Sequence, residues 1–273
     1  MTVQPPDGAG GRVLATDLDG TLIPLDGDQR NRSDLETLAT QLLRTNVTLV
    51  FVTGRHLSSV MEAIKEFHLP RPGWIICDVG TSLHERGVSG DFEPVTAYWR
   101  HQDEIIASMP ISDLRERLKS LEGLLLQEQE KQGRFKLSFY ADAAHLNEVV
   151  GRVQRTLDQA GAPFSIIRSV DPFNGDGLID LLPVAVSKAY ALSWWIEHTG
   201  RRPEDIVFAG DSGNDLAALT AGYRAILVGN ADRGLAEQVR MAHQQAGWGD
   251  RLFVARGKAT SGVLEGCCKF EVF

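Results

Sequence analysis

The stretch Leu14-Ala15-Thr16-Asp17-Leu18-Asp19-Gly20-Thr21-Leu22, LATDLDGTL, begins as an apolar strand and then places two carboxylates just before a glycine. Side chains along a strand point alternately to opposite faces, so we expect Asp17 and Asp19 to share a face. Two like charges this close repel each other unless a partner neutralises them. The stretch therefore predicts a core strand that ends at a charged site.

The composition is that of a globular protein with an excess of acidic residues. The chain has 273 residues, of which 43% are hydrophobic and 23% charged, and its net charge is −8. This charge disfavours a nucleic-acid surface, and no apolar run approaches the ~18 residues of a membrane span. Residues 1–11 lack the apolar core of a signal peptide and predict a loose leader. We expect a cytoplasmic protein with no nucleic-acid or membrane partner.

Short apolar runs alternate with helix-period stretches on both sides of a different middle segment. RVLATDL, VTLVFVTG and GWIICDVG precede that segment as strands, and DIVFAG, RAILVG and LFVA follow it. This order predicts βα units around a parallel sheet. The first helix is expected to begin after Ser33, with Glu36 completing a capping box.

The middle segment, from His84 to Pro183, has the order helix, strand, helix, strand, strand. Neighbouring antiparallel strands with covering helices indicate a small α+β insert, and insertions at surface loops are well tolerated. We therefore predict an α/β fold with a Rossmann-like parallel-sheet core in two segments, 1–83 and 184–273, and an inserted α+β cap over 84–183.

Four short motifs fall where a strand ends or a helix begins: DLDGT at 17–21, VTGR at 52–55, SK at 187–188 and GDSGND at 210–215. Each has an ordinary explanation by itself, such as a turn, a strand end, a solvated lysine or a helix cap. GDSGND is the most specific, because capping needs one such polar residue and not three. Together the motifs favour a site at the carboxyl edge of the sheet, where ligands of open α/β sheets bind.

The chemistry that suits these residues is phosphoryl transfer. Mg²⁺ prefers oxygen ligands and keeps several waters, and Asp17, a second oxygen from residue 19 and Asp211 would form such an open site. The cation would neutralise the clustered carboxylates, while Asp17 attacks phosphorus and forms an aspartyl phosphate. Thr53 and backbone N–H groups would hold the phosphate oxygens. Lys188 would supply positive charge in the transition state.

With these motifs the chain resembles the haloacid dehalogenase (HAD) superfamily of phosphatases over nearly its whole length after the leader. The insert between the second and third motifs resembles the superfamily's type II cap, in its IIB form. Further stretches, namely VGTSL, DLLP…SK, AGDSGND, LVGNAD and GVLEGCCKF, resemble sucrose-phosphate phosphatases. The resemblance implies a HAD core, a type IIB cap, and Mg²⁺-dependent hydrolysis of a small-molecule sugar phosphate monoester.

The resemblance also implies a role for each motif residue. Asp17 would be the nucleophile and Asp19 the general acid and base. The metal would be held by Asp17, Asp19 through its carbonyl oxygen, Asp211 and Asp215, of which Asp215 would also support Lys188. The residues expected to contact phosphate are Thr53, Gly54, Arg55, Lys188 and Asn214.

The substrate is left open between two sugar phosphates. A disaccharide phosphate of the sucrose 6-phosphate type is expected first, and an amino-sugar phosphate of the kanosamine 6-phosphate kind second, because the connection RSVDPFNGDGLIDLLP is longer than the loop of sucrose-phosphate phosphatases. A phosphomannomutase-like phosphotransferase and a non-catalytic, receiver-like module are the remaining alternatives. The aromatic-basic cluster at 98–101 suits either sugar contact or packing of the cap.

Overall fold

The computed structural model describes residues 11–170 and 175–273, which divide into two compact units. The first unit comprises the described residues up to Glu93 together with Lys188–Phe273, and the second is Pro94–Ser187. The expected boundary at His84 therefore differs from the structure, because His84 lies in a strand of the first unit's sheet and pairs with Ile75. The second boundary also lies a few residues later than expected, just before Lys188.

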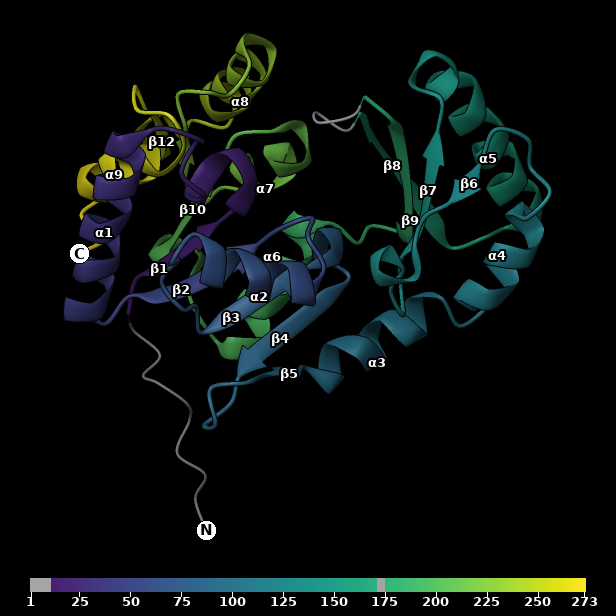
Figure 1. Ribbon diagram of the computed structural model, residues 1–273, viewed down its shortest axis with the longest axis horizontal. Helices are drawn as coiled ribbons and strands as arrows, with labels where there is room; N and C mark the ends of the chain where they lie inside the picture. The colour runs from purple at the N-terminus through teal and green to yellow at the C-terminus, as the bar shows by residue number, and fades with distance from the viewer. Residues whose placement is uncertain (1–10, 171–174) are drawn as a thin grey trace. The chain divides into compact units, whose positions relative to one another are not determined.

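The first unit is built on an eight-stranded sheet (Figure 1). Its order is β12-β11-β10-β1-β2-β3-β4-β5. The strands from β12 to β3 run parallel, and β4 joins β3 antiparallel. The strand bounds are β1 Val13–Thr16, β2 Thr48–Val52, β3 Trp74–Cys77, β4 Ser82–Arg86, β5 Phe92–Pro94, β10 Ile206–Gly210, β11 Arg224–Leu227 and β12 Leu252–Val254.

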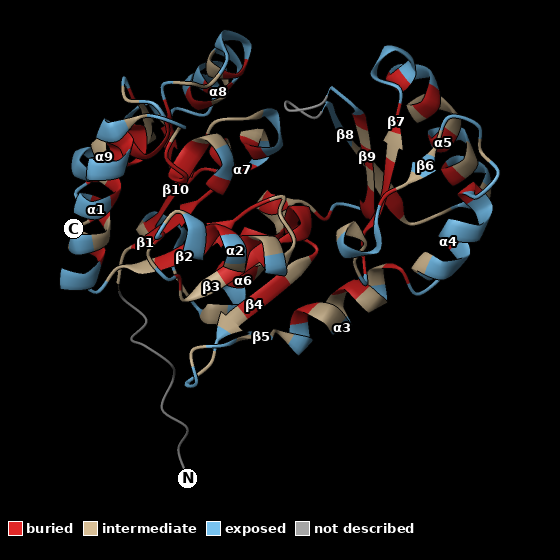
Figure 2. Ribbon diagram, in the orientation of Figure 1, coloured by how far each residue is buried: buried red, intermediate tan, exposed pale blue. Residues whose placement is uncertain are grey.

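The central strands of this sheet are buried, as the red strand segments in Figure 2 show. Apolar side chains of α1, α2 and α9 form one core cluster with the strands. In addition, α6 contacts β3, and α7 contacts β10 and β11. The helix bounds are α1 Gln29–Arg44, α2 Leu57–Glu66, α6 Lys188–Thr199, α7 Leu216–Leu219, α8 Arg233–Gln245 and α9 Ala259–Lys269.

The strand order creates a switch point beside β1. The chain passes from β1 to β2 and β3 on one side, and it returns through β10 to β11 and β12 on the other. Loops that leave β1 and β10 at their carboxyl ends therefore diverge, and a crevice at such a point is where open α/β sheets bind ligands. Asp17 directly follows β1 and Asp211 directly follows β10.

The first helix begins earlier than expected. α1 starts at Gln29, and its N-cap is Asp28, whose side chain accepts a hydrogen bond from the Asn31 N–H. The expected cap at Ser33 is therefore wrong, because Ser33 and Glu36 already lie inside the helix. Asp28 is as good a cap as serine, so local sequence offered two possible starts.

The second unit is a four-stranded antiparallel sheet of order β6-β7-β9-β8. Leu137 and Phe139 of β7 and Ile179 and Leu181 of β9 share a core cluster with residues of its helices. The prediction of an α/β core with an inserted α+β unit is therefore confirmed. The element bounds are α3 Thr96–Ile105, α4 Ile111–Leu118, β6 Leu125–Leu126, β7 Leu137–Ala141, α5 Leu146–Ala160, β8 Phe164–Val170 and β9 Gly177–Pro183.

Among the described residues, every helix is too short or too polar to traverse a lipid bilayer.

Candidate active site

Asp17 is buried at the end of β1, with 4% of its surface exposed. Its Oδ1 accepts a hydrogen bond of 2.8 Å from Lys188 Nζ. β1 ends at Thr16, and Leu18–Leu22 form a helical turn. The expectation that Asp17 and Asp19 share a strand face is therefore wrong, because the strand ends before both residues.

Gly20 allows this turn to approach the loop after β10. Its φ of +72° lies in the left-handed region, and a Cβ at this position would collide with the Asp211 carboxylate. Asp211 is oriented from two sides: Thr21 Oγ1 donates to its Oδ1 at 3.0 Å, and Asn230 Nδ2 donates to its Oδ2 at 3.1 Å. The two motifs, 190 residues apart in sequence, thus form one hydrogen-bonded unit.

Lys188 connects the first, third and fourth motifs. Its ammonium donates to Asp17 and to Asp215 Oδ1, each at 2.8 Å, and to Asn214 Oδ1 at 3.2 Å. The lysine is 1% exposed and Asp215 is fully buried. A buried ammonium is stable only when it is paired in this way. The alternative of a solvated helix lysine is therefore excluded.

Asp215 is held by its own loop as well as by Lys188. Its Oδ2 accepts hydrogen bonds from the backbone N–H groups of Asp211 and Ser212 and from the Ser212 hydroxyl. Gly210 makes room for the carboxylate, because a Cβ there would lie 2.8 Å from the Asp215 Cβ. Both oxygens of Asp215 are therefore occupied by protein donors, which suits a supporting role beside a metal.

The carboxylates of Asp17 and Asp211 are costly to ionise in this site, so their pKa values are raised. Burial raises the pKa of Asp17 to about 8, and Asp215 and Asp211 add to the shift although Lys188 opposes it. Burial and the charge of Asp215 raise the pKa of Asp211 to about 6. Burial disfavours the charge of Lys188, but Asp17 and Asp215 outweigh that effect and raise its pKa.

A divalent cation fits this cluster. One oxygen each of Asp17, Asp211 and Asp215 lie within 4.8 Å of one another. With the three acids ionised, Lys188 leaves two negative charges uncompensated, and a divalent ion would balance them. The donors are carboxylate oxygens, which hard cations prefer. The raised pKa values of Asp17 and Asp211 agree with this fit, since burial and the neighbouring acids make these carboxylates costly to ionise without a cation.

Asp19 lies apart from the buried acids and pairs with Arg55. The guanidinium donates from Nε to Asp19 Oδ2 at 2.8 Å and from Nη2 to Oδ1 at 2.6 Å. Such two-pronged pairs fix the plane of the carboxylate. The Asp19 side chain is 52% exposed, unlike Asp17. Arg55 was expected to contact phosphate, and in this structure its described partners are Asp19 and Ser59.

The remaining motif residues lie at the same sheet edge. Thr53 directly follows β2, is fully buried, and accepts a hydrogen bond of 3.2 Å from the Arg55 N–H. Gly54 lies between them in the same loop. Asn214 is exposed, and its Oδ1 accepts hydrogen bonds from Ser212 and Lys188. The structure therefore brings residues of all four motifs together within the first unit, with Lys188 from the third motif.

Asn230 belongs to the site but received no role from the sequence. Its Nδ2 donates to the Gly20 carbonyl at 2.8 Å as well as to Asp211, and its Oδ1 accepts from the Ala259 N–H. It therefore joins the turn after β1 to the loop after β10. The signal was available: LVGNAD follows β11 at the same carboxyl edge as the four motifs.

The aromatic and basic residues outside the motifs differ in their burial. Tyr98 is fully buried, which favours packing over sugar contact, whereas Arg100 is exposed. Trp195 is also fully buried and contacts Trp74 edge-on at 5.8 Å, so it packs α6 onto the sheet. Residues 171–174 of the long connection lie outside the described part of the chain.

Comparison with known proteins assigns the family. The family model described as Sucrose-6F-phosphate phosphohydrolase matches residues 11–271. The mannosylfructose-phosphate phosphatase of Agrobacterium fabrum is 33% identical over 260 residues, which cover 93% of this chain and 95% of that protein. Sucrose-phosphatase 1 of Nicotiana tabacum is 26% identical over 271 residues, which cover 95% of this chain and 59% of that protein.

Solved structures share the fold. The sucrose-phosphatase of Synechocystis, solved in complex with sucrose and phosphate, has a TM-score of 0.72 at 24% identity, covering 95% of this chain and 98% of that one. A haloacid dehalogenase-like hydrolase of Bacillus subtilis has a TM-score of 0.68 at 17% identity, covering 100% of this chain and 94% of that one. The resemblance drawn from the motifs is thereby confirmed. The chain belongs to the sucrose-6F-phosphate phosphohydrolase family of the HAD superfamily and is a phosphoric monoester hydrolase.

Proposed function

We propose that the chain hydrolyses a disaccharide phosphate of the sucrose 6-phosphate type, with Asp17 as nucleophile and Mg²⁺ as cofactor. The observation that carries the proposal is the Asp17–Lys188–Asp215 arrangement. It combines a buried nucleophile, a fixed ammonium and a carboxylate cluster that lacks its counter-charge.

In the first step, a carboxylate oxygen of Asp17 attacks phosphorus, and the bond between phosphorus and the sugar oxygen breaks. Asp19 gives its proton to the departing sugar oxygen. In the second step, Asp19 takes a proton from water, whose oxygen attacks the phosphorus of the aspartyl phosphate. The bond from phosphorus to Asp17 breaks, which releases inorganic phosphate and restores both carboxyl groups.

The other residues of the site position these two groups. Lys188 holds one oxygen of Asp17 and leaves the second for the attack. Arg55 keeps the Asp19 carboxylate in one plane until the substrate arrives. Thr53 and Asn214 would bind phosphate oxygens together with Lys188. Both carboxylate oxygens of Asp19 accept hydrogen bonds from Arg55, so the acid step requires Asp19 to loosen this contact.

The family uses a divalent metal, and Asp17, Asp211 and the carbonyl of Asp19 would hold it, with Asp215 beside them. When bound, Mg²⁺ would neutralise the carboxylates and stabilise negative charge on the phosphate. The donor set supports this assignment, because all three clustered side chains are carboxylates, which suit Mg²⁺ better than the softer donors of cysteine or histidine do.

Selection of the sugar belongs to the second unit in this proposal. Side chains alternate along β7, so Leu137 and Phe139 enter the core while Ser138 and Tyr140 point to the opposite face. Ser138 donates to Asp180 of β9, and the Tyr140 hydroxyl donates to Glu128 and accepts from Lys131. We call these five residues, Glu128, Lys131, Ser138, Tyr140 and Asp180, the polar sheet face. Ser138 is buried and orients Asp180, while the hydroxyl, carboxylate and ammonium groups of the other four residues match the hydroxyls of a sugar.

A mannosylfructose phosphate is the second candidate substrate. The relative from Agrobacterium fabrum named for that activity aligns with nearly the full length of both chains at 33% identity. The amino-sugar alternative rests on a connection that includes residues 171–174, outside the described residues.

The test is release of inorganic phosphate from a panel of sucrose 6-phosphate, mannosylfructose phosphate, glucosamine 6-phosphate and glucose 1-phosphate. We expect fastest release from sucrose 6-phosphate, complete loss with EDTA, and recovery with Mg²⁺. Asp17→Asn should abolish turnover and phosphoenzyme formation, whereas Asp19→Asn should lower turnover about 10²–10⁴-fold and still bind substrate. Activity in verified absence of metal would refute the cofactor, and transfer of phosphate between sugar positions would favour the mutase.

A further inference from the structure

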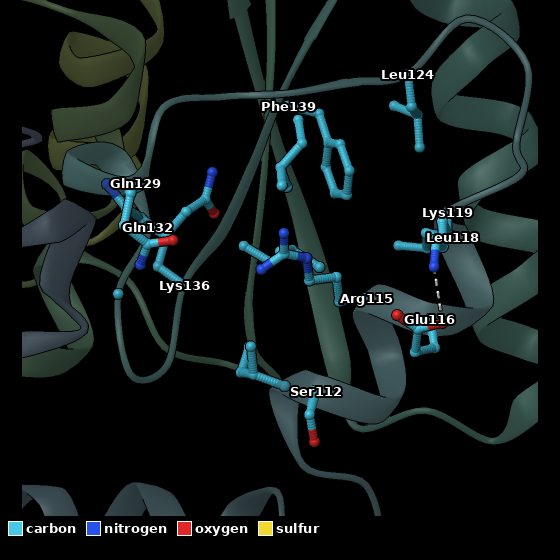
Figure 3. Close-up of a pocket in the computed structure, with 14 residues that line it drawn as sticks. Ser112, Arg115, Glu116, Leu118, Lys119, Leu124, Gln129, Gln132, Lys136 and Phe139 are labelled. Atoms are coloured by element: carbon cyan, nitrogen blue, oxygen red, sulfur yellow. Dashed lines mark hydrogen bonds and ion pairs between the residues drawn. The ribbon is translucent and has the colours of Figure 1, made fainter.

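A cavity of about 560 Å³ opens within the second unit, between α4 and the segment that runs from β6 into β7 (Figure 3). Its volume lies in the range that small-molecule sites occupy. All of its lining residues fall between Ile111 and Phe139 in the second unit, whereas the motif residues proposed to act on phosphate, Lys188 included, lie in the first. The cavity is therefore distinct from the residues proposed for phosphate chemistry.

One wall of the cavity is apolar and incompletely covered. Leu118 and Phe139 line the cavity and belong to the buried core of the unit. Ile111, Leu124 and Leu126 also line the cavity but are only partly buried, so they leave apolar surface facing the space. A ligand with an apolar body would cover this surface and gain from its burial.

The wall opposite these apolar residues contains Gln132, and its side chain is fixed by hydrogen bonds without a ligand. The Nε2 group donates to the carbonyls of Gln127 and Ser138 at 2.9 and 3.0 Å, and Oε1 accepts from the Ser138 N–H at 2.8 Å. A wall tied to β7 in this manner does not need to be ordered on binding, which lowers the entropic cost of binding.

The charge of the lining is positive, against the net charge of −8 for the whole chain. Arg115, Lys119 and Lys136 line the cavity together with one acid, Glu116, which already pairs with Lys119 at 3.4 Å. Arg115 has no ion-pair or hydrogen-bond partner among the residues that the structure describes. By contrast, the nearby Arg134 pairs with Asp103 at 2.8 Å. Figure 3 shows the Arg115 side chain in the middle of the cavity, between Glu116 on α4 and Gln132 on the far wall.

We propose that this cavity is a binding site for a small organic anion, whose carboxylate or phosphate group pairs with the Arg115 guanidinium and whose apolar body rests on Ile111, Leu124 and Leu126. A guanidinium recognises both kinds of anion through two parallel hydrogen bonds. The apolar wall excludes inorganic phosphate as the preferred ligand, because that ion covers none of the exposed apolar surface. The proposal is independent of which sugar phosphate the enzyme hydrolyses.

The test is a fluorescence titration with 8-anilinonaphthalene-1-sulfonate, a probe that combines an aromatic body with an anionic group. Saturating inorganic phosphate and Mg²⁺ are present throughout, so that the phosphate site is occupied. We expect one class of site with a dissociation constant on the order of 10⁻⁵ M, and competition by benzoate and by phenylphosphonate. The stronger of these two competitors identifies whether the natural ligand is a carboxylate or a phosphate.

Arg115→Gln should weaken probe binding at least about tenfold, the loss expected for a charge-assisted contact. Arg117→Gln is the matched control, because Arg117 also lies on α4 but does not line the cavity, and it should leave binding unchanged. Equal binding by both variants, or no saturable binding by the unmodified protein, would overturn the proposal. Phosphate release measured on the same samples shows separately whether the proposed function holds.

Discussion

Lys188 is a buried ammonium between Asp17 and Asp215, and its removal would leave two buried carboxylates without their partner. Breaking a buried pair in this way costs about 3–5 kcal/mol. We therefore expect Lys188→Met to lower the free energy of unfolding in EDTA by about this amount and to abolish turnover. Urea unfolding measures the first effect, and added Mg²⁺ should restore part of the loss.

The matched control for this prediction is Lys65→Met, since Lys65 is exposed near the end of α2. Its unfolding free energy should change by less than about 0.5 kcal/mol. If the Lys188 variant behaved like this control, the ammonium would not be compensating the acids.

Asp211 makes stability depend on pH when the metal is absent. Its pKa is raised to about 6 in the folded protein, mainly by burial, from an ordinary value of 3.8. Between these two values the folded protein keeps a proton that the unfolded chain has released, so stability falls as pH rises through this interval. Asp211→Asn should remove this contribution and make the EDTA-treated protein more stable at pH 7.5, by roughly 1–2 kcal/mol after allowance for solvent screening.

The measurement is the melting temperature of both proteins at pH 4.5 and pH 7.5, in EDTA and in Mg²⁺. Without metal, the advantage of the variant should appear at the higher pH and shrink at the lower one. With Mg²⁺ the unmodified protein should gain more than the variant, because the ion stabilises only the protein that binds it. An advantage of the same size at both pH values would contradict the assigned titration.

At the scale of elements, the turn after β1 needs a residue in the left-handed conformation, which is Gly20, and it must also approach the loop after β10 closely. Gly20→Ala should disturb both features, because the added methyl strains φ and collides with Asp211. We expect loss of Mg²⁺-dependent phosphate release by more than about 10²-fold, as misplaced catalytic groups cause.

Gly27→Ala is the matched control for Gly20→Ala, because it introduces backbone strain without a steric collision. Gly27 has nearly the same φ, +71°, but an added Cβ there would meet no atom within 4 Å. This variant should lose about 1 kcal/mol of stability, as expected for a left-handed residue that is not glycine, and keep its turnover. Equal losses of activity in both variants would assign the effect to backbone strain alone.

The elements that sequence predicts well here are those with local signals. Apolar runs located the parallel strands, and polar residues directly after them located the site at the carboxyl edge. Asp19 shows the limit, because the end of β1 at Thr16 depends on where hydrogen bonding to β2 and β10 stops. Arg55 shows a second limit of prediction from sequence. Its partner Asp19 lies 36 residues away, and many arrangements of the loops after β1 and β2 fit the same motifs.

At the scale of the whole molecule, the order of the units was predictable and their boundaries were not. β4 and β5 extend the core sheet at its edge, although the sequence around His84 already differs from the βα pattern. An antiparallel edge strand has no crossover helix to mark it, so its membership depends on pairing with β3 and not on local periodicity. The residues of the polar sheet face were likewise missed, because Ser138 and Asp180 meet only when β7 and β9 pair, and Glu128 and Lys131 meet Tyr140 only through the fold of the connection before β7.

The proposed roles of the two units, phosphate chemistry in the first and sugar binding in the second, lead to a prediction about which substrates the enzyme prefers. The proposed phosphate and metal residues all lie in the first unit, whereas the polar sheet face lies in the second. Tyr140→Phe and Asp180→Asn each remove one hydrogen-bonding function and keep the side chain's shape. If the polar sheet face binds the sugar, each variant should lose about 10–100-fold in kcat/KM for the disaccharide phosphate, as the loss of a hydrogen bond to a charged or hydroxyl group costs.

The same variants should hydrolyse p-nitrophenyl phosphate within about twofold of the unmodified rate, since this substrate offers no sugar hydroxyls and its phosphate meets the first unit's residues unchanged. Glu130→Gln is the matched control, because Glu130 is exposed in the turn between Glu128 and Lys131 and should affect neither substrate. Equal losses on both substrates would mean that the polar sheet face does not select the sugar. Loss on the disaccharide phosphate alone would instead place substrate choice on β7 and β9, because the attack on phosphorus proposed for Asp17 cannot distinguish one sugar from another.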